Sequence, residues 1–239
     1  MTDIDTTNDD CLNCSLANLC FPSAFNEKEL FRFSNIANTN ITYKANSDLY
    51  QQGNNVQYLY VIKSGSFKTH SSTVSGSQHT HDFLLPGELP GLEGLADRVA
   101  LNTATAIEDS VVCRINYPQL IALRQELPRL SDYSVRMYGE ALALSQSMLG
   151  CISKPSAASR LACFILIMLN RTTRVKPDSN ELYLNMSRKD IACYLGLAVE
   201  TVSRSFSKLV SWGYISKSKR KIQILDAEGL QLCATNTEF

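Results

Sequence analysis

Three of the eight cysteines in this 239-residue chain lie close together near its N-terminus, at Cys11, Cys14 and Cys20. Cysteine thiolates are the ligands that zinc ions and iron–sulfur clusters take from a protein. A zinc finger would pair the Cys-x2-Cys spacing with a second close pair, which this chain lacks. A tetrahedral zinc or a cubane cluster needs four ligands, so the spacing predicts a metal centre whose fourth ligand comes from far along the chain.

The fourth ligand has five candidates, which are Cys113, Cys151, Cys163, Cys193 and Cys233. Cys163 and Cys193 fall on apolar faces of predicted helices, where a free cysteine commonly acts as a small core residue. Cys233 lies in what reads as a tail. Cys113 ends a predicted strand, which favours it over Cys151 without excluding the latter. Eight cysteines in a cytosolic chain indicate metal binding or redox chemistry more than disulfides.

Two features predict a cytoplasmic protein whose thiols are kept reduced and which has no membrane partner. The N-terminus is acidic and polar, unlike a secretion signal. The longest apolar run covers residues 161–169 and is too short to span a bilayer.

The charge is unevenly distributed along the chain. Residues 1–155 contain 11 basic and 16 acidic side chains, whereas residues 156–239 contain 12 and 7. A basic C-terminal part behind an acidic N-terminal part is typical of a DNA-binding domain attached to a separate sensing domain.

The segment from Ser187 to Arg204 has helix-turn-helix spacing. Ser187 can cap a first helix that runs to Leu195, Ala192 is small where two helices must approach, and Gly196 allows a sharp turn. We expect the buried face of the second helix to be formed by Val199, Val202 and Phe206.

The exposed face of that second helix contains side chains that can read bases in a major groove. Arg204 can donate two hydrogen bonds to guanine, and Glu200 can accept one from cytosine. The following hairpin, residues 214–225, is basic at its tip, as expected of a wing that contacts phosphate. The predicted DNA-binding residues are Glu200, Ser203, Arg204, Ser207, Lys208, Lys219 and Arg220.

The elements in front of this unit predict an α+β fold. A short helix is expected at residues 26–36, and residues 41–117 contain short β-branched and aromatic segments separated by glycines, as in a barrel, sandwich or roll. A long helix follows Pro128 and ends at the break 154–156. Its apolar positions recur at heptad spacing, which predicts a dimer seam formed by Tyr138, Leu142, Ser145, Leu149 and Ile152. The alternative is an amphipathic helix packed on its own roll.

From Cys11 to about Leu225 the chain resembles the FNR branch (fumarate and nitrate reduction regulator) of the CRP/FNR transcription regulators. The matching features are Cys11-x2-Cys14-x5-Cys20 with Cys113 far downstream, and Glu200-x-x-Ser203-Arg204 on the reading helix. The resemblance implies an N-terminal cluster-binding segment (1–25), a β-roll sensor domain of the cyclic-nucleotide-binding type (26–127), a dimerisation helix (128–154) and a winged-helix DNA-binding domain (155–239).

The resemblance also implies a function. Cys11, Cys14, Cys20 and Cys113 would hold a 4Fe–4S cluster that oxygen converts to 2Fe–2S. The homodimer would bind TTGAT-N4-ATCAA in double-stranded DNA and control anaerobic gene expression, as an activator or a repressor and not as an enzyme. The loop 71–78, from Ser71 to Gln78, matches a surface used on RNA polymerase. The apolar residues between the cysteines would pack around the cluster and near the dimer helix; they are Leu12, Leu16, Leu19 and Phe21.

Two alternatives stay open on the residues. The first is a CRP-like regulator of the same fold with a structural zinc or a small-molecule effector. A cyclic-nucleotide pocket would need an arginine and a hydroxyl where this chain has Ala100 and Leu101, and Arg98 lies too early. The second is a redox enzyme or electron carrier, for which no nucleophile–base pair, Gly-rich phosphate loop or flavin motif is seen. The chain departs from the family at Ser145, a seam position where relatives can have an acidic residue. Two facing carboxylates would repel each other, so the neutral Ser145 predicts a cluster-free form that dimerises more readily than in such relatives.

Overall fold

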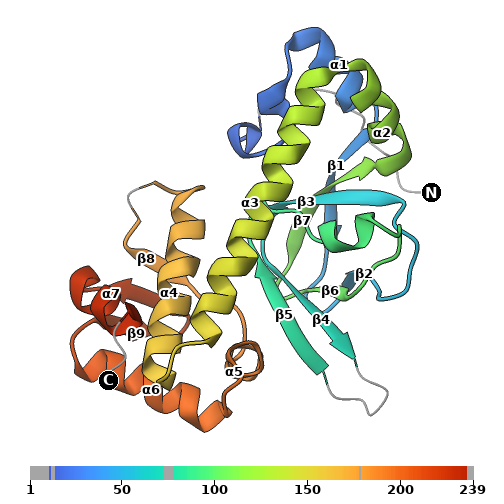
Figure 1. Ribbon diagram of the computed structural model, residues 1–239. Coiled ribbons are helices and arrows are strands. Elements are labelled where there is room, and N and C mark those ends of the chain that lie inside the picture. Colours follow the sequence, from blue (N-terminus) through green and yellow to red (C-terminus); the bar gives the residue numbers. More distant parts are fainter. Residues whose placement is uncertain (1–10, 12–13, 73–77, 178, 236–239) are drawn as a thin grey trace. The chain divides into compact units, whose positions relative to one another are not determined.

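The computed structural model describes residues 11, 14–72, 78–177 and 179–235 (Figure 1). The chain divides into two compact units. The first contains residues 1–69 and 84–139, and the second contains residues 70–83 and 140–239. None of the helices in the described ranges is long and apolar enough to cross a membrane.

The strands of the roll form two antiparallel sheets (Figure 1). One has the order β1-β7-β3, with β1 at Ala37–Tyr43, β7 at Ser110–Asn116 and β3 at Tyr58–Ser64. The other has the order β2-β6-β4-β5, with β2 at Asp48–Tyr50, β6 at Thr103–Ala106, β4 at Phe67–Ser72 and β5 at Gln78–Leu84. Their shared core includes the fully buried side chains of Ile62, Phe67 and Val112. The predicted α+β roll is therefore confirmed.

A glycine fixes the turn between β3 and β4. Gly65 has a φ of 84°, and a Cβ atom at this position would lie 2.1 Å from the Ser110 hydroxyl oxygen. Any side chain here would both strain the backbone and displace β7.

Helices cover one end of the first unit. The chain enters through the 3-10 helices η1 (Ala17–Leu19) and η2 (Phe21–Ala24), followed by α1 (Glu27–Ser34). Asn26 and Glu29 form a capping box that starts α1 where the sequence predicts it. A third 3-10 helix, η3 (Leu92–Leu95), lies in the roll, and α2 (Tyr117–Glu126) leads into α3 (Pro128–Ile152). The ring of Phe21 lies 5.4 Å from Phe33 on α1 and 5.5 Å from Tyr133 on α3, so an aromatic cluster fixes the N-terminal segment.

The second unit is a winged helix. Its helices are α4 (Ala157–Thr173), α5 (Arg188–Leu195), α6 (Val199–Ser211) and α7 (Ala227–Thr235). Its sheet has the order β8-β10-β9, with β8 at Glu181–Tyr183, β10 at Lys221–Ile224 and β9 at Ile215–Ser218. Ser156 caps α4, which packs against α6 and α7 and has Leu161, Phe164 and Ile165 fully buried. The ring of Phe164 lies 5.8 Å from that of Tyr194 on α5.

Two expectations about the cysteines were wrong. Cys233 does not lie in a tail but is fully buried on α7, a helix that starts where Asp226 accepts the Gly229 amide at 2.9 Å. Cys163, which was expected to act as a small core residue with a free thiol, is joined to Cys151 by a disulfide. A sequence pattern does not show that the end of α3 and the body of α4 approach closely enough for this bond.

Candidate cysteine site and nucleic-acid interface

All four predicted cluster ligands line one cavity in the first unit. Cys11, Cys14 and Cys20 come from the N-terminal segment, and Cys113 comes from the middle of β7, opposite Val61 on β3. The turn that leads into η1 brings Cys14 close to Cys20, because the Ala17 amide donates to the Cys14 carbonyl at 3.0 Å. The remaining wall is mainly apolar and consists of Leu16, Phe33, Ala37, Thr39, Val61, Lys63 and Ile115.

A β-bulge accompanies Cys113 in the sheet. The pairing of β1 with β7 shifts register between Asn38 and Ile41, opposite Cys113, and Asn40 has a φ of 59°. Bulges bend a strand locally and re-aim side chains next to functional sites. The Nζ atom of Lys63 donates to the Asn40 side chain at 2.6 Å, which holds a positive charge at the same cavity.

The four thiols influence one another electrostatically. Burial raises the pKa of the Cys20 thiol well above its usual range, and the neighbouring Cys113, Cys11 and Cys14 raise it further. The backbone amide of Phe21 opposes this rise by hydrogen bonding. A thiol in this position stays protonated until a cation or a metal centre compensates the charge of the thiolate.

The four thiols are not arranged around a preformed metal site. Within the described ranges, no group of three or more His, Cys, Asp or Glu side chains is placed to hold one. The cavity between the thiols has a free volume of about 20 Å³, enough for about one water molecule. The candidate donors are all sulfur and their surroundings are mostly apolar, a donor set that both zinc ions and iron–sulfur clusters use.

The cysteine segment is connected to α3 by direct contacts. Phe21 and Leu16 are 2% and 3% exposed, and Phe21 packs on Tyr133. Burial raises the pKa of Tyr133. A hydrogen bond with the Ser23 side chain lowers this pKa, and the charge of a Cys20 thiolate would raise it. The predicted packing of Leu16 and Phe21 around the site and near the long helix therefore matches the contacts, while Leu12 lies outside the described residues.

The nucleic-acid interface is built by α5, a tight turn and α6. Ser187 and Asp190 form a capping box at the start of α5, and Gly196 ends the helix with a φ of 62°. The predicted helix-turn-helix is confirmed. The buried face of α6 differs slightly from expectation, because Val199 is 37% exposed while Val202, Ser205, Phe206 and Leu209 are buried.

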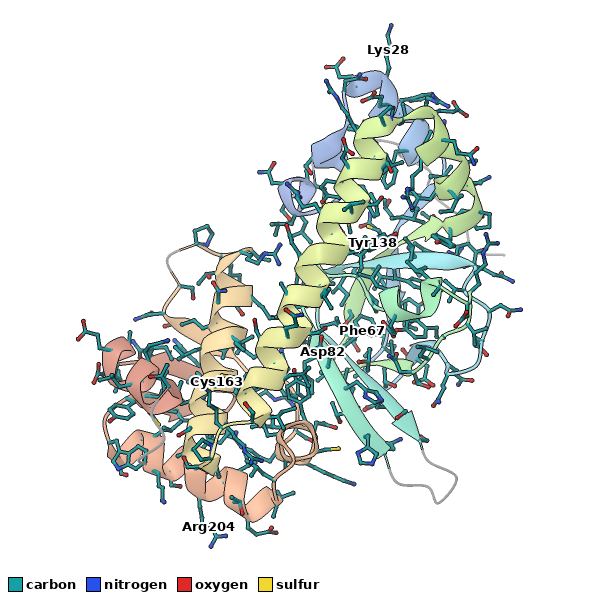
Figure 2. The ribbon with its side chains drawn as sticks, in the orientation of Figure 1. Lys28, Phe67, Asp82, Tyr138, Cys163 and Arg204 are labelled. Atoms are coloured by element: carbon teal, nitrogen blue, oxygen red, sulfur yellow. A yellow bond between two sulfur atoms is a disulfide. The ribbon has the colours of Figure 1, made fainter. Side chains whose placement is uncertain are left out.

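The five predicted reading residues of α6 all lie on its exposed face; they are Glu200, Ser203, Arg204, Ser207 and Lys208. Figure 2 shows Arg204 pointing away from the rest of the winged helix. Its guanidinium reaches the Thr201 hydroxyl at 3.5 Å, and the described part of the chain contains no ion pair between Glu200 and Arg204. Both charges are therefore available to a ligand.

The wing is a tight hairpin with a basic tip. Lys219 and Arg220 form the two-residue turn between β9 and β10, both are exposed, and Lys219 has a φ of 52°. Lys221, which also belongs to the basic run, is paired with Glu181 at 2.6 Å. The tip charges therefore come mainly from Lys217, Lys219 and Arg220.

One basic residue of this surface was not predicted. Arg188, at the start of α5, stacks on the Phe206 ring with its guanidinium carbon 3.4 Å from the centroid. Its Nη1 atom is buried and has no hydrogen-bond partner, and burial lowers the pKa of Arg188. Lys217 lies 5.6 Å from the same ring. The Phe206 ring thus holds the half-buried Arg188 beside the wing, where it adds positive charge to the candidate DNA surface, and the sequence hint was a basic residue in the first turn of the first helix.

The long helix α3 presents an apolar line to solvent. Val135, Leu142 and Leu149 recur every seven residues and are 64%, 62% and 66% exposed. Of the other predicted seam residues, Tyr138 and Ile152 are half-buried, and Ser145 is exposed with its hydroxyl donating to the Ala141 carbonyl at 3.0 Å. Val135 extends the predicted seam by one position.

Comparison with known proteins identifies the chain. Residues 40–126 match the cyclic nucleotide-binding domain, and residues 159–233 match the Crp-like helix-turn-helix domain. The chain is 34% identical over 224 residues to the transcriptional activator protein Anr of Pseudomonas protegens, covering 94% of this chain and 91% of the relative. It is 31% identical over 227 residues to the fumarate and nitrate reduction regulatory protein of Salmonella typhi, covering 95% and 91%.

The chain belongs to the FNR branch of the CRP/FNR family. FixK2 from Bradyrhizobium japonicum has a similar structure, with a TM-score of 0.74, 25% identity, and coverage of 83% of this chain and 98% of that one. The sequence-based resemblance is confirmed, and the protein is a DNA-binding transcription regulator.

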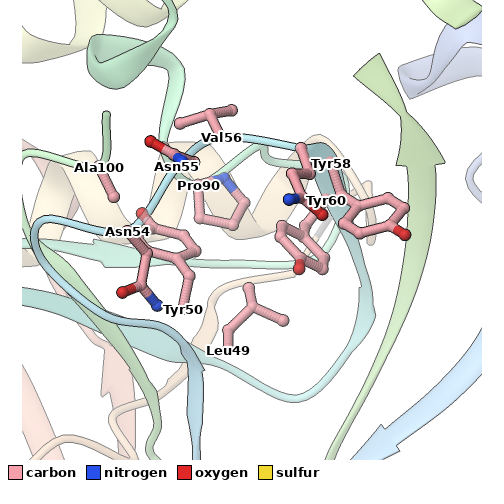
Figure 3. A pocket seen from close by; sticks show the side chains of 11 residues that line it. Leu49, Tyr50, Asn54, Asn55, Val56, Tyr58, Tyr60, Pro90 and Ala100 are labelled. Carbon is pink, nitrogen blue, oxygen red and sulfur yellow. The ribbon is translucent and has the colours of Figure 1, made fainter. Parts of the chain in front are cut away.

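In this FNR-family chain, the cavity of the roll is poorly suited to a cyclic nucleotide (Figure 3). Its volume is about 150 Å³, below the roughly 300 Å³ at which ligand pockets begin. The Tyr50 hydroxyl lies 3.1 Å from the Asn102 side chain, which in turn donates to Glu93. Ala100 lines the cavity, no arginine does, and Arg98 is exposed.

Proposed function

We propose that this regulator senses oxygen through a 4Fe–4S cluster held by Cys11, Cys14, Cys20 and Cys113. The observation that supports this most directly is that all four thiols line one cavity, although ninety-odd residues separate Cys113 from the others. The cluster would supply the reaction with oxygen, which converts it to 2Fe–2S. The chain supplies four thiolates, an apolar wall and the charge of Lys63.

Loading the site requires movement of the cysteine segment. The free volume of about 20 Å³ between the thiols is smaller than a cluster, so we infer that Cys20 and Cys113 lie farther apart when the site is loaded. The 3-10 turn η1, at Ala17–Leu19, lies just before Cys20, and η2, at Phe21–Ala24, follows it. The segment's main attachment is Phe21, which is buried among aromatic rings.

The state of the cysteine segment should reach α3 through the contacts of Phe21 and Cys20 with Tyr133. A cluster that joins Cys20 to Cys113 closes a long loop against the roll, and its loss returns conformational entropy to the segment. Tyr133, on the buried face of α3, then loses its ordered contact with the ring of Phe21. Oxygen would therefore weaken the packing that holds this helix in place.

Dimerisation is inferred from the exposed apolar line of α3. Leu142 and Leu149 would pair with a second copy across a two-fold axis, in a seam of coiled-coil type. Two copies of α6 would then read a palindrome such as TTGAT-N4-ATCAA, with Arg204 and Glu200 contacting its guanine and the paired cytosine. The RNA polymerase contact predicted for loop 71–78 stays a prediction, because residues 73–77 lie outside the described part of the chain.

The cluster is tested by anaerobic purification followed by analysis of iron, acid-labile sulfide and zinc. We expect about four irons and four sulfides per chain, as a 4Fe–4S cluster requires. Cys113→Ala should abolish the visible absorbance and anaerobic operator binding, whereas Cys193→Ala, on α5, should keep the absorbance. One zinc per chain without sulfide, or a normal cluster in Cys113→Ala, would contradict the proposal.

The missed residue Arg188 gives a test of the DNA surface. Because its charge lies on the same Phe206 ring as Lys217 of the basic wing, Arg188→Met should weaken binding to operator and random DNA alike and reduce the salt dependence of binding by about one phosphate contact. Arg160→Met is a suitable control, since Arg160 donates to the Lys154 carbonyl at 2.8 Å within the same unit. An unchanged salt slope in Arg188→Met would show that the residue serves only the packing of Phe206.

A further inference from the structure

A second sulfur pair lies far from the four-cysteine site in the sequence. Cys151 occupies the last turn of α3, and Cys163 lies in the middle of α4, with a Cα–Cα distance of 5.5 Å. Disulfides form when this distance is about 4.4–6.8 Å, so no backbone movement is needed to make or break the bond. The proposed cluster uses neither residue.

The two sulfurs differ in their access to solvent. Cys151 is fully buried, whereas Cys163 is half-buried and lines an open cavity of about 520 Å³ in the second unit. Lys154 lines the same cavity. The thiolate is the form of cysteine that oxidants attack, and it must be reached from solvent. A small oxidant that enters the cavity can therefore reach the Cys163 sulfur, whereas the buried Cys151 sulfur can react only with Cys163.

We propose that Cys151 and Cys163 form a reversible dithiol–disulfide switch that responds to hydroperoxides. In the first step the Cys163 thiolate attacks hydrogen peroxide, forming a sulfenic acid and releasing hydroxide, which takes up a proton to give water. In the second step the Cys151 thiol attacks the Cys163 sulfur, forming the disulfide and releasing a second water. Two thiols thus lose two electrons and two protons to one peroxide, and a small dithiol reverses the reaction by exchange.

The bond acts on the junction between α3 and α4. Residues 153–156 connect the two helices. The Ser153 and Lys154 amides donate back to the Leu149 and Cys151 carbonyls of α3, each at 3.1 Å, and so extend its last turn into the connection. Arg160 adds one more bond, to the Lys154 carbonyl. The disulfide spans the junction and holds it closed covalently. Reduction leaves it dependent on hydrogen bonds that open locally.

Peptide mapping under non-reducing conditions tests the bond directly. Trypsin releases Cys151 on peptide 137–160, because Lys154 precedes proline, and Cys163 on peptide 161–171. The full-length protein is reduced with dithiothreitol, treated with hydrogen peroxide, alkylated and digested. We expect a linked pair of these two peptides that disappears on renewed reduction. Two separately alkylated peptides after peroxide, or a link that dithiothreitol does not break, would overturn the proposal.

Hydrogen exchange tests the effect on the junction. The amides of Ser153 and Lys154 should exchange about tenfold more slowly in the oxidised protein than in the reduced one, because opening then requires the linked helices to move together. Cys163→Ala should exchange at the reduced rate with and without peroxide. Equal rates in both redox states of the wild type would show that the bond does not control the junction.

The switch must also be separable from the cluster. In Cys113→Ala, which lacks the proposed cluster, the linked peptides should still form on peroxide treatment and disappear on reduction. Loss of the link in this variant would show that Cys151 and Cys163 react only as a consequence of cluster damage, and would refute an independent switch.

Discussion

Leu142 offers the sharpest test of whether this regulator dimerises through α3. It lies in the middle of the line formed with Val135 and Leu149, and it is 62% exposed in one chain. A leucine in this position is costly to leave in water and gains most from a partner helix. We predict that Leu142→Ala weakens dimerisation of the cluster-loaded protein and, through it, operator binding.

The magnitude follows from the exposed surface. Full burial of a leucine side chain is worth about 1.5–3 kcal/mol, so covering the 62% that is exposed contributes about 1–2 kcal/mol in each copy. Because the two-fold axis brings two copies of Leu142 together, the contribution to dimer stability doubles to about 2–4 kcal/mol. Alanine keeps one carbon of the leucine side chain, so Leu142→Ala should lose about 2–3 kcal/mol of this stability. The dimer dissociation constant should therefore rise about 30- to 150-fold.

Sedimentation velocity over a range of protein concentrations measures this constant under anaerobic conditions. Leu232→Ala is the matched control, because Leu232 is 55% exposed on α7 and lies outside the seam, and it should change the constant by less than about threefold. Circular dichroism checks that both variants keep their helices. If Leu142→Ala with an intact helix dimerises as tightly as the wild type, the seam lies on another surface.

Three further outcomes are expected. Arg204→Ala should cost about 1–3 kcal/mol and relax discrimination at the guanine of each half-site, whereas Lys219→Ala should weaken all sequences alike; titrations with operator and random DNA separate the two. Lys63→Met should speed the loss of cluster absorbance in air several-fold, because a cation beside the thiols stabilises the more reduced state, while exposed Lys28→Met should leave the rate unchanged. Ser145→Asp should make the cluster-free protein monomeric, because two carboxylates would face each other across the seam; a wild-type protein that is equally monomeric at micromolar concentration would argue against this.

The local elements were predictable where capping and turn chemistry are strong. Asn26 and Ser187 each cap the helix expected behind them, and Gly196 adopts the left-handed conformation that the turn requires. The exposed face of α6 followed from helical spacing alone, because one buried stripe leaves the opposite side chains in solvent. At the edge of that stripe the same reasoning failed, and Val199 is partly exposed.

Long-range proximity was predictable only where a functional pattern pointed to it. The spacing of the first three cysteines required a fourth ligand, but the residues alone did not decide between Cys113 and Cys151. The structure separates them, since Cys113 faces the cysteine segment from β7 and Cys151 bonds to Cys163. No periodicity in a sequence reports that two helices cross at a given residue, so this disulfide was beyond prediction. The stacking of Arg188 on Phe206 was hidden for the same reason.

The helix α3 is the element on which these features converge. Its buried face contains Tyr133, which contacts the cysteine segment, and Cys151, which is bonded to α4. Its opposite face contains the exposed leucines of the proposed seam. Tyr133 belongs to the first unit and Cys151 to the second, so the two proposed inputs act on different parts of this helix. A variant that removes one input, such as Cys113→Ala or Cys163→Ala, should therefore leave the response to the other intact.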